Sequence, residues 1–209
     1  MEHLLTVRDL KTQFDTPNGL VKAVDGISYN INDNEIVGLV GESGCGKSVS
    51  QLSVMQLIQT PPGKIVNGEV IFEGQDLMQV RSNSKEIRSI RGGKIGMVFQ
   101  EPMTSLNPVL TIAQQMTETM KLHLQMEKHI AMKLAADLLD RVGISDPEKR
   151  LNEYPHTFSG GMRQRIMIAM AISCDPKLII ADEPTTAVDV TTQAQLLELL
   201  KEMIERLNS

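Results

Sequence analysis

The sequence predicts an α/β fold with a largely parallel sheet, into which a helical subdomain is inserted. Two observations support this prediction: short apolar segments recur along the chain, and helical patterns lie between them. Several of the apolar segments are continuous rather than alternating, as expected of strands that are covered on both faces. Ligands of such folds gather at the carboxyl ends of the strands, so functional residues are expected there.

The strands are expected where the apolar segments lie. In chain order these are Leu4–Leu10, Gly26–Ile31, Glu35–Val40, Val70–Phe72, Ile95–Phe99 and Leu178–Ala181. The clearest helical pattern runs from Ile130 to Val142, with apolar residues on one stripe and charged residues elsewhere. We expect a single domain that covers residues 1–209.

The stretch from Glu101 to Tyr154 breaks the alternation of strands and helices. It contains no convincing strand and several helical patterns, and prolines bound it at both ends. We therefore expect residues 101–158 to form the inserted helical subdomain. The α/β core then comprises residues 1–100 and 159–209.

The composition excludes several classes of protein. The chain is 41% hydrophobic and 22% charged, and no segment approaches the ~20 consecutive apolar residues of a membrane span. The first residues lack the basic start and apolar run of a secretory signal, so a cytoplasmic location is expected. Two cysteines are too few for a disulfide framework and lack the paired spacing of a metal site. A net charge of −5 offers no long-range attraction to nucleic acid.

A phosphate-binding loop follows the apolar segment that ends at Val40. The motif G-x-x-x-x-G-K-[ST] is matched in full by Gly41, Glu42, Ser43, Gly44, Cys45, Gly46, Lys47 and Ser48, and Val49 follows it. Glycines let the backbone curl so that successive N–H groups point at phosphate oxygens, and the helix that follows adds its positive N-terminal end. We expect Lys47 to reach the β- and γ-phosphates and Ser48 to ligate Mg²⁺.

A second candidate lies where the last apolar segment ends in two acids, Asp182 and Glu183, followed by Pro184. An acid at the carboxyl end of a buried strand is placed to hold the magnesium that bridges the phosphates, and we assign this role to Asp182. Side chains of neighbouring strand residues point to opposite faces, so Glu183 joins the same site only where the strand gives way. Glu183 is then available to orient and deprotonate the attacking water.

A third candidate is a turn before the helical run Ile166–Ile172. Ser159 is a good N-cap residue, Gly160 and Gly161 follow it, and free N–H groups at a helix start attract an anion. Without further context, an ordinary capped helix is the favoured explanation of this turn.

The order of these motifs resembles the nucleotide-binding domain of ABC ATPases. The residues that carry the resemblance are Lys47, Gln100, Ser159, Asp182, Glu183 and Asp189. It implies a P-loop NTPase core with an N-terminal antiparallel β-subdomain, and ATP and Mg²⁺ as cofactors. It also implies that Phe14 stacks on adenine, that Gln100 senses magnesium and the membrane partner, and that Asp189 belongs to a loop at a dimer interface. Taken without the family, Phe14 is a core residue and Gln100 a polar strand cap.

Within this family the sequence looks most like the ATPases of dipeptide and oligopeptide importers, a branch that includes nickel importers. The stretches that carry this closer resemblance are Val98–Pro108, Tyr154–His156 and Asp182–Thr186. Met162 replaces the usual glutamine of the family signature, and Val188 replaces the usual leucine before Asp189. Family members continue into a further strand that ends in a histidine, so this chain resembles a fragment, for which we expect low ATPase activity.

The resemblance implies an ATPase subunit that drives a separate membrane permease from the cytoplasmic face of the cell membrane. It implies a second ATPase subunit, identical or different. Each nucleotide is then held between the phosphate loop of one subunit and the turn Ser159–Gly161 of the other, here called the signature turn. No nucleic acid partner and no direct membrane insertion are expected. The alternative is a nucleotide-binding module that does not hydrolyse ATP.

Overall fold

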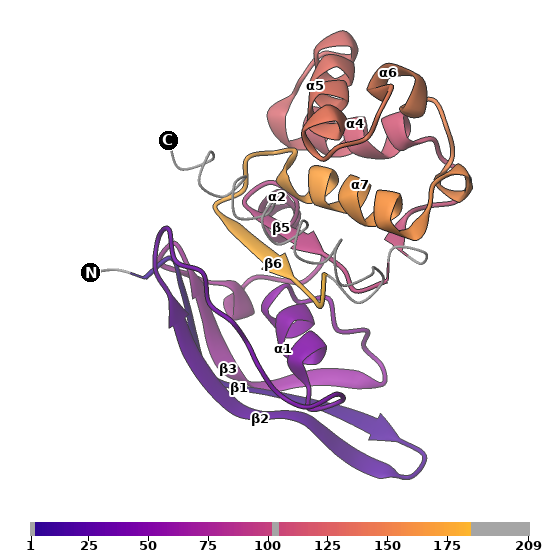
Figure 1. Ribbon diagram of the computed structural model, residues 1–209. Helices are drawn as coiled ribbons and strands as arrows, with labels where there is room; N and C mark the ends of the chain where they lie inside the picture. The colour runs from indigo at the N-terminus through magenta and orange to yellow at the C-terminus, as the bar shows by residue number, and fades with distance from the viewer. Residues whose placement is uncertain (1–2, 102–104, 185–209) are drawn as a thin grey trace. The chain divides into compact units, whose positions relative to one another are not determined.

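The structure of the protein, a computed structural model, describes residues 3–101 and 105–184. The chain divides into two compact units, residues 1–88 and 89–209. Figure 1 shows the helices and strands of each unit.

The first unit is built on an antiparallel sheet of four strands in the order β2-β1-β3-β4. The strands are β1 (Leu5–Thr16), β2 (Gly19–Ile31), β3 (Gly63–Phe72) and β4 (Gln75–Asp76). The helical elements are α1 (Lys47–Val54), η1 (Leu77–Gln79) and α2 (Lys85–Ile90). In Figure 1 the three long strands lie side by side, and α1 packs against β1. The antiparallel β-subdomain expected at the N-terminus is therefore present.

The strand expected at Glu35–Val40 is not formed, and this prediction was wrong. The segment has no strand assignment, and the side chains of Ile36 and Val40 are 67% and 90% exposed. An apolar run becomes a strand only where another strand accepts its hydrogen bonds, and within the described part of this unit no strand pairs with these residues. Three other predictions, on Val188, Asp189 and the helix from Thr191 to Leu207, lie outside the described residues.

The second unit contains the parallel strands and most of the helices. The strands are β5 (Ile95–Val98) and β6 (Leu178–Ala181), paired in parallel with Val98 opposite Ala181. The helical elements are α4 (Ile112–Leu124), α5 (Lys128–Arg141), α6 (Pro147–Arg150), η2 (Pro155–Thr157) and α7 (Gly160–Ile172). Helices between two parallel strands confirm the predicted α/β class.

The helices between residues 105 and 158 share one hydrophobic core with α7 and β5. α4 begins where Thr111 and Gln114 form a capping box, in which each side chain bonds the backbone N–H of the other residue. Met116 and Met120 of α4 are fully buried in this core, as is Val98 at the end of β5. α7 packs against both α5 and β5, so the helix that follows the signature turn joins the helices to the strands.

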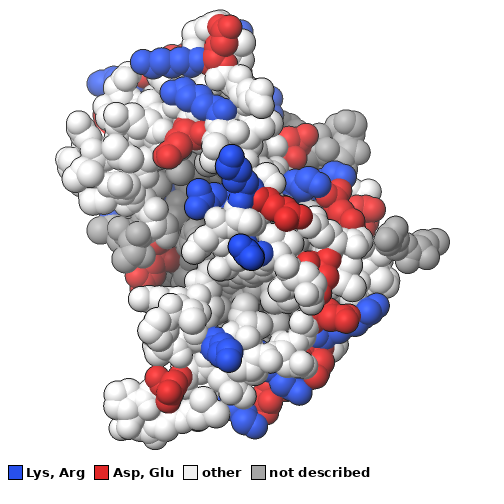
Figure 2. Space-filling view, turned by 180° about the vertical axis from the view of Figure 1, so that it is seen from behind, with Lys and Arg blue, Asp and Glu red and all other residues white. Residues whose placement is uncertain are grey.

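Figure 2 shows Lys and Arg beside Asp and Glu on the face that it presents, in keeping with the net charge of −5. Within the described ranges, no helix is both long and apolar enough to cross a membrane.

Candidate nucleotide-binding site

The phosphate loop forms an exposed turn that leads directly into α1, which begins at Lys47. The side chain of Lys47 folds back over the loop, and its Nζ atom donates hydrogen bonds to the carbonyl oxygens of Gly41 (2.8 Å) and Glu42 (2.9 Å). An ammonium group held inside a curled backbone is positioned to exchange these carbonyl oxygens for phosphate oxygens. The loop and helix context predicted for this motif is therefore present.

Gly46 is the residue that allows the loop to enter the helix. Its backbone is left-handed, with φ of +98°, a conformation that side chains disfavour. A Cβ atom at this position would also lie 2.1 Å from the carbonyl oxygen of Ala23 on β2. Both constraints explain why this position is a glycine. The lack of a side chain lets the loop approach the backbone of β2 closely.

A buried pair of hydroxyl groups holds α1 on the sheet. Thr12 Oγ1 of β1 and Ser53 Oγ of α1 lie 2.7 Å apart, and both side chains are fully buried. Ser53 Oγ also donates to the carbonyl oxygen of Val49, one turn earlier in the helix. The helix that follows the phosphate loop is therefore attached to β1 by a specific polar contact as well as by packing.

Phe14, the expected adenine-stacking residue, lies near the end of β1 in the same unit as the phosphate loop. It is half-buried and lies opposite Gly63 of β3. A Cβ atom on Gly63 would lie 2.8 Å from Phe14 Cε1 and 2.5 Å from Ile58 Cγ2. The ring therefore rests against a bare backbone position, and it is not wholly enclosed by the core.

The ends of β5 and β6 bring three polar residues of the second unit together. Asp182 is 5% exposed, and its N–H donates to the carbonyl oxygen of Val98 at 2.9 Å. Glu183 has a φ of +43°, an uncommon conformation for a residue with a side chain, so β6 gives way at this residue. Gln100 Nε2 donates a hydrogen bond to Glu183 Oε2 at 2.9 Å. Two of the three expected catalytic residues, Gln100 and Glu183, are thus in direct contact.

The signature turn is more helical than the sequence indicated. Ser159 is the N-cap of α7, as predicted, and its hydroxyl accepts a hydrogen bond from the N–H of Met162 at 3.3 Å. Gly160 and Gly161 belong to the first turn of the helix rather than to a preceding loop, because this bond starts the helix at Gly160. Their N–H groups belong to the positive end of a helix of 13 residues.

Two arginines that the sequence did not single out brace the segment before α7. Arg163 Nε donates to the carbonyl oxygen of Pro155 at 2.8 Å, and the Arg150 guanidinium lies 5.7 Å from the centre of the buried Phe158 ring. Arg150 also donates to Glu153 at 2.8 Å, and this bond is the main reason that the pKa of Glu153 is lowered. Arg150 and Glu153 are only three residues apart, whereas Arg163 and Pro155 are eight residues apart and lie beyond the spacing of a local helical pair.

The residues expected to hold magnesium are Ser48, Gln100 and Asp182. Their hydroxyl, amide and carboxylate oxygens are the hard ligands that Mg²⁺ prefers, and Mg²⁺ usually completes its shell with waters and substrate phosphates. The Gln100 amide nitrogen is turned toward Glu183, which leaves the amide oxygen for a cation. In the described part of the chain, no group of three or more His, Cys, Asp or Glu side chains could hold a metal ion alone. Each of the three residues therefore carries an oxygen of the type that magnesium takes, and the assignment of the ion to them is left to the proposed function.

A phosphate loop that opens a helix, together with a buried acid at the end of a parallel strand, defines a P-loop nucleotide-binding protein. The family model described as "ABC transporter" matches residues 24–186. The chain therefore belongs to the ABC transporter family of ATP-binding proteins.

Relatives at about half identity are ATP-binding proteins of peptide transport. The chain is 50% identical to "Oligopeptide transport ATP-binding protein OppD" of Bacillus subtilis (strain 168), over 99% of this chain and 57% of that protein. It is 51% identical to "Dipeptide transport ATP-binding protein DppD" of Escherichia coli (strain K12), over 98% of this chain and 62% of that protein. The chain thus spans about three-fifths of the length of these relatives.

Among solved structures, the fold is similar to the ATP-binding cassette MJ0796, described as the dimeric structure of a post-hydrolysis state bound to ADP and Pi. The TM-score is 0.84 at 27% identity, and the match covers 97% of this chain and 83% of that chain. The fold class and the family expected from the sequence are therefore confirmed.

Proposed function

We propose that this chain is the ATP-binding and ATP-hydrolysing part of a peptide importer that works with a separate membrane permease. The observation that carries the proposal is the phosphate loop, with Lys47 folded over it, in a chain about half identical to peptide-transport ATP-binding proteins. Peptides are preferred to nickel as the cargo because the relatives named above are oligopeptide and dipeptide transport proteins.

In this proposal the first unit binds the nucleotide. The backbone N–H groups of Gly41–Ser48 and of Val49, in the first turn of α1, surround the phosphates, and Lys47 neutralises the β- and γ-phosphates. Phe14 stacks on the adenine ring. Phe14 and the phosphate loop belong to the same compact unit, in which the buried hydroxyl pair attaches α1 to β1. Elements of this one unit therefore make both contacts with the nucleotide.

The chemistry of hydrolysis is assigned in this proposal to residues of the second unit, together with Ser48 of the first unit. Ser48, Gln100 and Asp182 hold Mg²⁺, which neutralises charge on the phosphates when it is bound. Glu183 takes the proton of the attacking water. The hydrogen bond from Gln100 keeps the Glu183 carboxylate in one orientation, which supports a role as a positioned base.

The partners follow from the same proposal. A second ATPase subunit, identical or different, contributes the N-terminus of α7, where Ser159, Gly160 and Gly161 present N–H groups to the γ-phosphate. The MJ0796 cassette, whose fold is similar, is a dimer. The permease would place the protein at the cytoplasmic face of the membrane, without insertion of this chain.

The proposed function is tested by phosphate release and thermal denaturation of the chain with Mg-ATP. ATP that binds only the folded state should raise the melting temperature, and steady release of phosphate should accompany it. A thermal shift without phosphate release would favour a nucleotide-binding module that does not hydrolyse ATP. No shift at millimolar Mg-ATP would contradict nucleotide binding itself.

Cys45 should react more slowly with a maleimide when Mg-ATP is bound. Its thiol is exposed in the phosphate loop, and bound phosphates would cover that loop. At an ATP concentration ten times the Kd, mass action predicts about tenfold slower labelling. Timed labelling followed by mass spectrometry measures the rate.

Cys174 is the internal control for this labelling. It is buried, and burial raises the pKa of its thiol, so it should react slowly with or without ATP. Equal rates at Cys45 in both conditions would argue that the phosphates do not occupy this loop.

A further inference from the structure

Along β1, the side chains that face the core change from odd-numbered to even-numbered residues at Asp9. Before this residue Leu5 and Val7 are the most deeply buried, at 2% and 1% exposure, and Thr6 between them is 8% exposed. After it Leu10 and Thr12 are buried, each at 0%. Side chains of a regular strand alternate between faces, so a strict alternation from Val7 would have placed Asp9 itself in the core.

The change of face results from one extra residue in β1. Opposite β2, Arg8 and Asp9 together face Ser28, because Val7 pairs with Tyr29 and Leu10 pairs with Ile27. Opposite β3, the pairing also slips by one residue after Arg8. β1 therefore has a β-bulge relative to both neighbouring strands. Each β1 side chain after the bulge lies on the opposite face from the one that regular alternation would give it.

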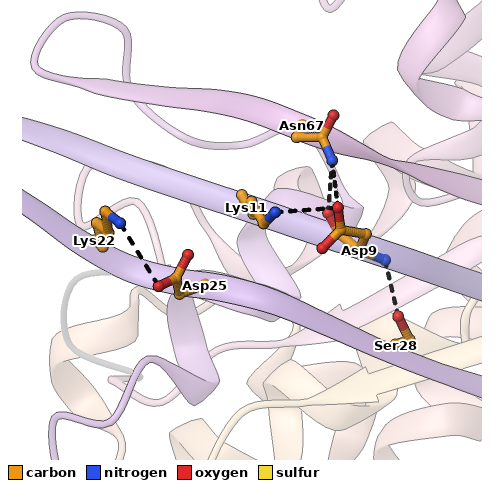
Figure 3. A network of polar contacts seen from close by, with 6 residues as sticks. All are labelled: Asp9, Lys11, Lys22, Asp25, Ser28 and Asn67. Carbon is orange, nitrogen blue, oxygen red and sulfur yellow. Dashed lines mark hydrogen bonds and ion pairs between the residues drawn. The ribbon is translucent and has the colours of Figure 1, made fainter.

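Asp9 anchors this bulge to both neighbouring strands, as Figure 3 shows. Its carboxylate accepts hydrogen bonds from Asn67 Nδ2 of β3 at 2.7 Å and from Lys11 Nζ at 3.1 Å. Its backbone N–H donates to Ser28 Oγ of β2 at 2.8 Å. Its φ is +42°, a left-handed conformation that aspartate and asparagine tolerate better than most residues. The anchoring bonds compensate for the cost of this conformation.

The face selected by the bulge is the face that carries α1. Thr12 lies on it and contacts Ser53 of α1 in the buried hydroxyl pair. Phe14 lies two residues after Thr12, and β1 gains no further extra residue between them, so its ring lies on the same face. Gly63, opposite Phe14, leaves room for the ring there. Without the bulge, Gln13 would take this side of the sheet and Phe14 the other.

We propose that Asp9 is the positioning residue that places Phe14 on the nucleotide side of the sheet, and so sets the contact with adenine. The proposal rests on the proposed function, in which Phe14 stacks on the base. Asp9 touches no nucleotide and acts through the register of β1. It should therefore affect recognition of the base and leave recognition of the phosphates unchanged.

The test compares the affinity for Mg-ATP with the affinity for inorganic tripolyphosphate, which has phosphates but no base. Asp9→Ala removes the anchor, and the affinity for ATP should fall about tenfold, the scale of one lost base–aromatic stack. The affinity for tripolyphosphate should stay the same. Asp9→Asn keeps an oxygen acceptor and a residue that tolerates the left-handed conformation, so it should restore ATP affinity. Asp25→Ala is the matched control, since this exposed carboxylate of the same sheet contacts Lys22 and not Asp9.

Phe14→Ala separates failure of this proposal from failure of the proposed function. If Phe14→Ala leaves the ratio of the two affinities unchanged, the adenine contact itself is wrong. If Phe14→Ala lowers the ratio but Asp9→Ala does not, or lowers both affinities equally, the role of Asp9 is wrong. In the Phe14→Ala background, Asp9→Ala should have no further effect on the ratio. Should Asp9→Ala fail to fold, Asn67→Ala, which removes one anchor, is judged by the same ratio.

Discussion

ATP binding should be lost when Lys47 is replaced by alanine. Its ammonium group is the one that the structure holds over the phosphate loop, within 2.8 Å of Gly41 O and 2.9 Å of Glu42 O. Two charge-assisted hydrogen bonds to phosphate oxygens contribute about 1.5–3 kcal/mol each, so the affinity should fall by about a hundredfold or more. Isothermal titration calorimetry with Mg-ATP measures the loss.

The control for this substitution is Lys85→Ala on α2. Lys85 is an exposed lysine of the same unit, so its removal changes the net charge equally but leaves the loop intact. Both variants should keep the circular dichroism spectrum of the parent chain. An ATP affinity of Lys47→Ala that matches the affinity of Lys85→Ala would refute the assignment of the phosphate loop.

The sequence was informative where a functional group depends on neighbours close in the chain. The phosphate loop, the N-cap at Ser159 and the strand end at Asp182 are local patterns, and the structure contains all three elements. A loop followed by a helix needs only a few consecutive residues of the right type, so a motif can predict it. The same reason explains why α4 begins at its capping box.

The sequence was uninformative where a residue depends on a partner far along the chain. In the sequence, Asp9 is simply a charged residue within a mainly apolar segment. The contact that gives it a role is with Asn67, which lies 58 residues away. The contact of Gln100 with Glu183 spans 83 residues. Such pairs depend on strand register, which hydrophobic alternation alone does not determine when a bulge shifts it by one residue.

At the segment from Ile36 to Val40, the local pattern predicted a strand that the structure does not contain. Its apolar residues satisfy every local criterion for a buried strand, yet the structure leaves it without a strand assignment and its side chains largely exposed. Strand formation depends on a neighbour that offers unpaired N–H and C=O groups. A local sequence pattern indicates whether a segment is apolar enough to be buried as a strand. It does not indicate whether another strand lies beside the segment to pair with it.

ATP hydrolysis should fall by about 10²–10⁴-fold in Glu183→Gln, while the affinity for ATP is retained. The substitution replaces the proposed base with an amide that does not accept the proton of water. It keeps an oxygen at the position of Oε2, which can still accept the hydrogen bond from Gln100 Nε2. Steady-state phosphate release and calorimetry, measured on the same preparation, report the two quantities.

Because the geometry around Gln100 is preserved, a loss of turnover in this variant reports on proton transfer rather than on a displaced side chain. Glu118→Gln on α4 is the matched control, since it makes the same chemical change at an exposed position of the same unit. Its rate should equal that of the parent chain. Glu183→Ala removes both the base and the acceptor for Gln100, so its rate should be no higher than that of Glu183→Gln. If Glu183→Gln releases phosphate as fast as Glu118→Gln, the base is another residue, and the contact between Gln100 and Glu183 serves only the structure of the strand end.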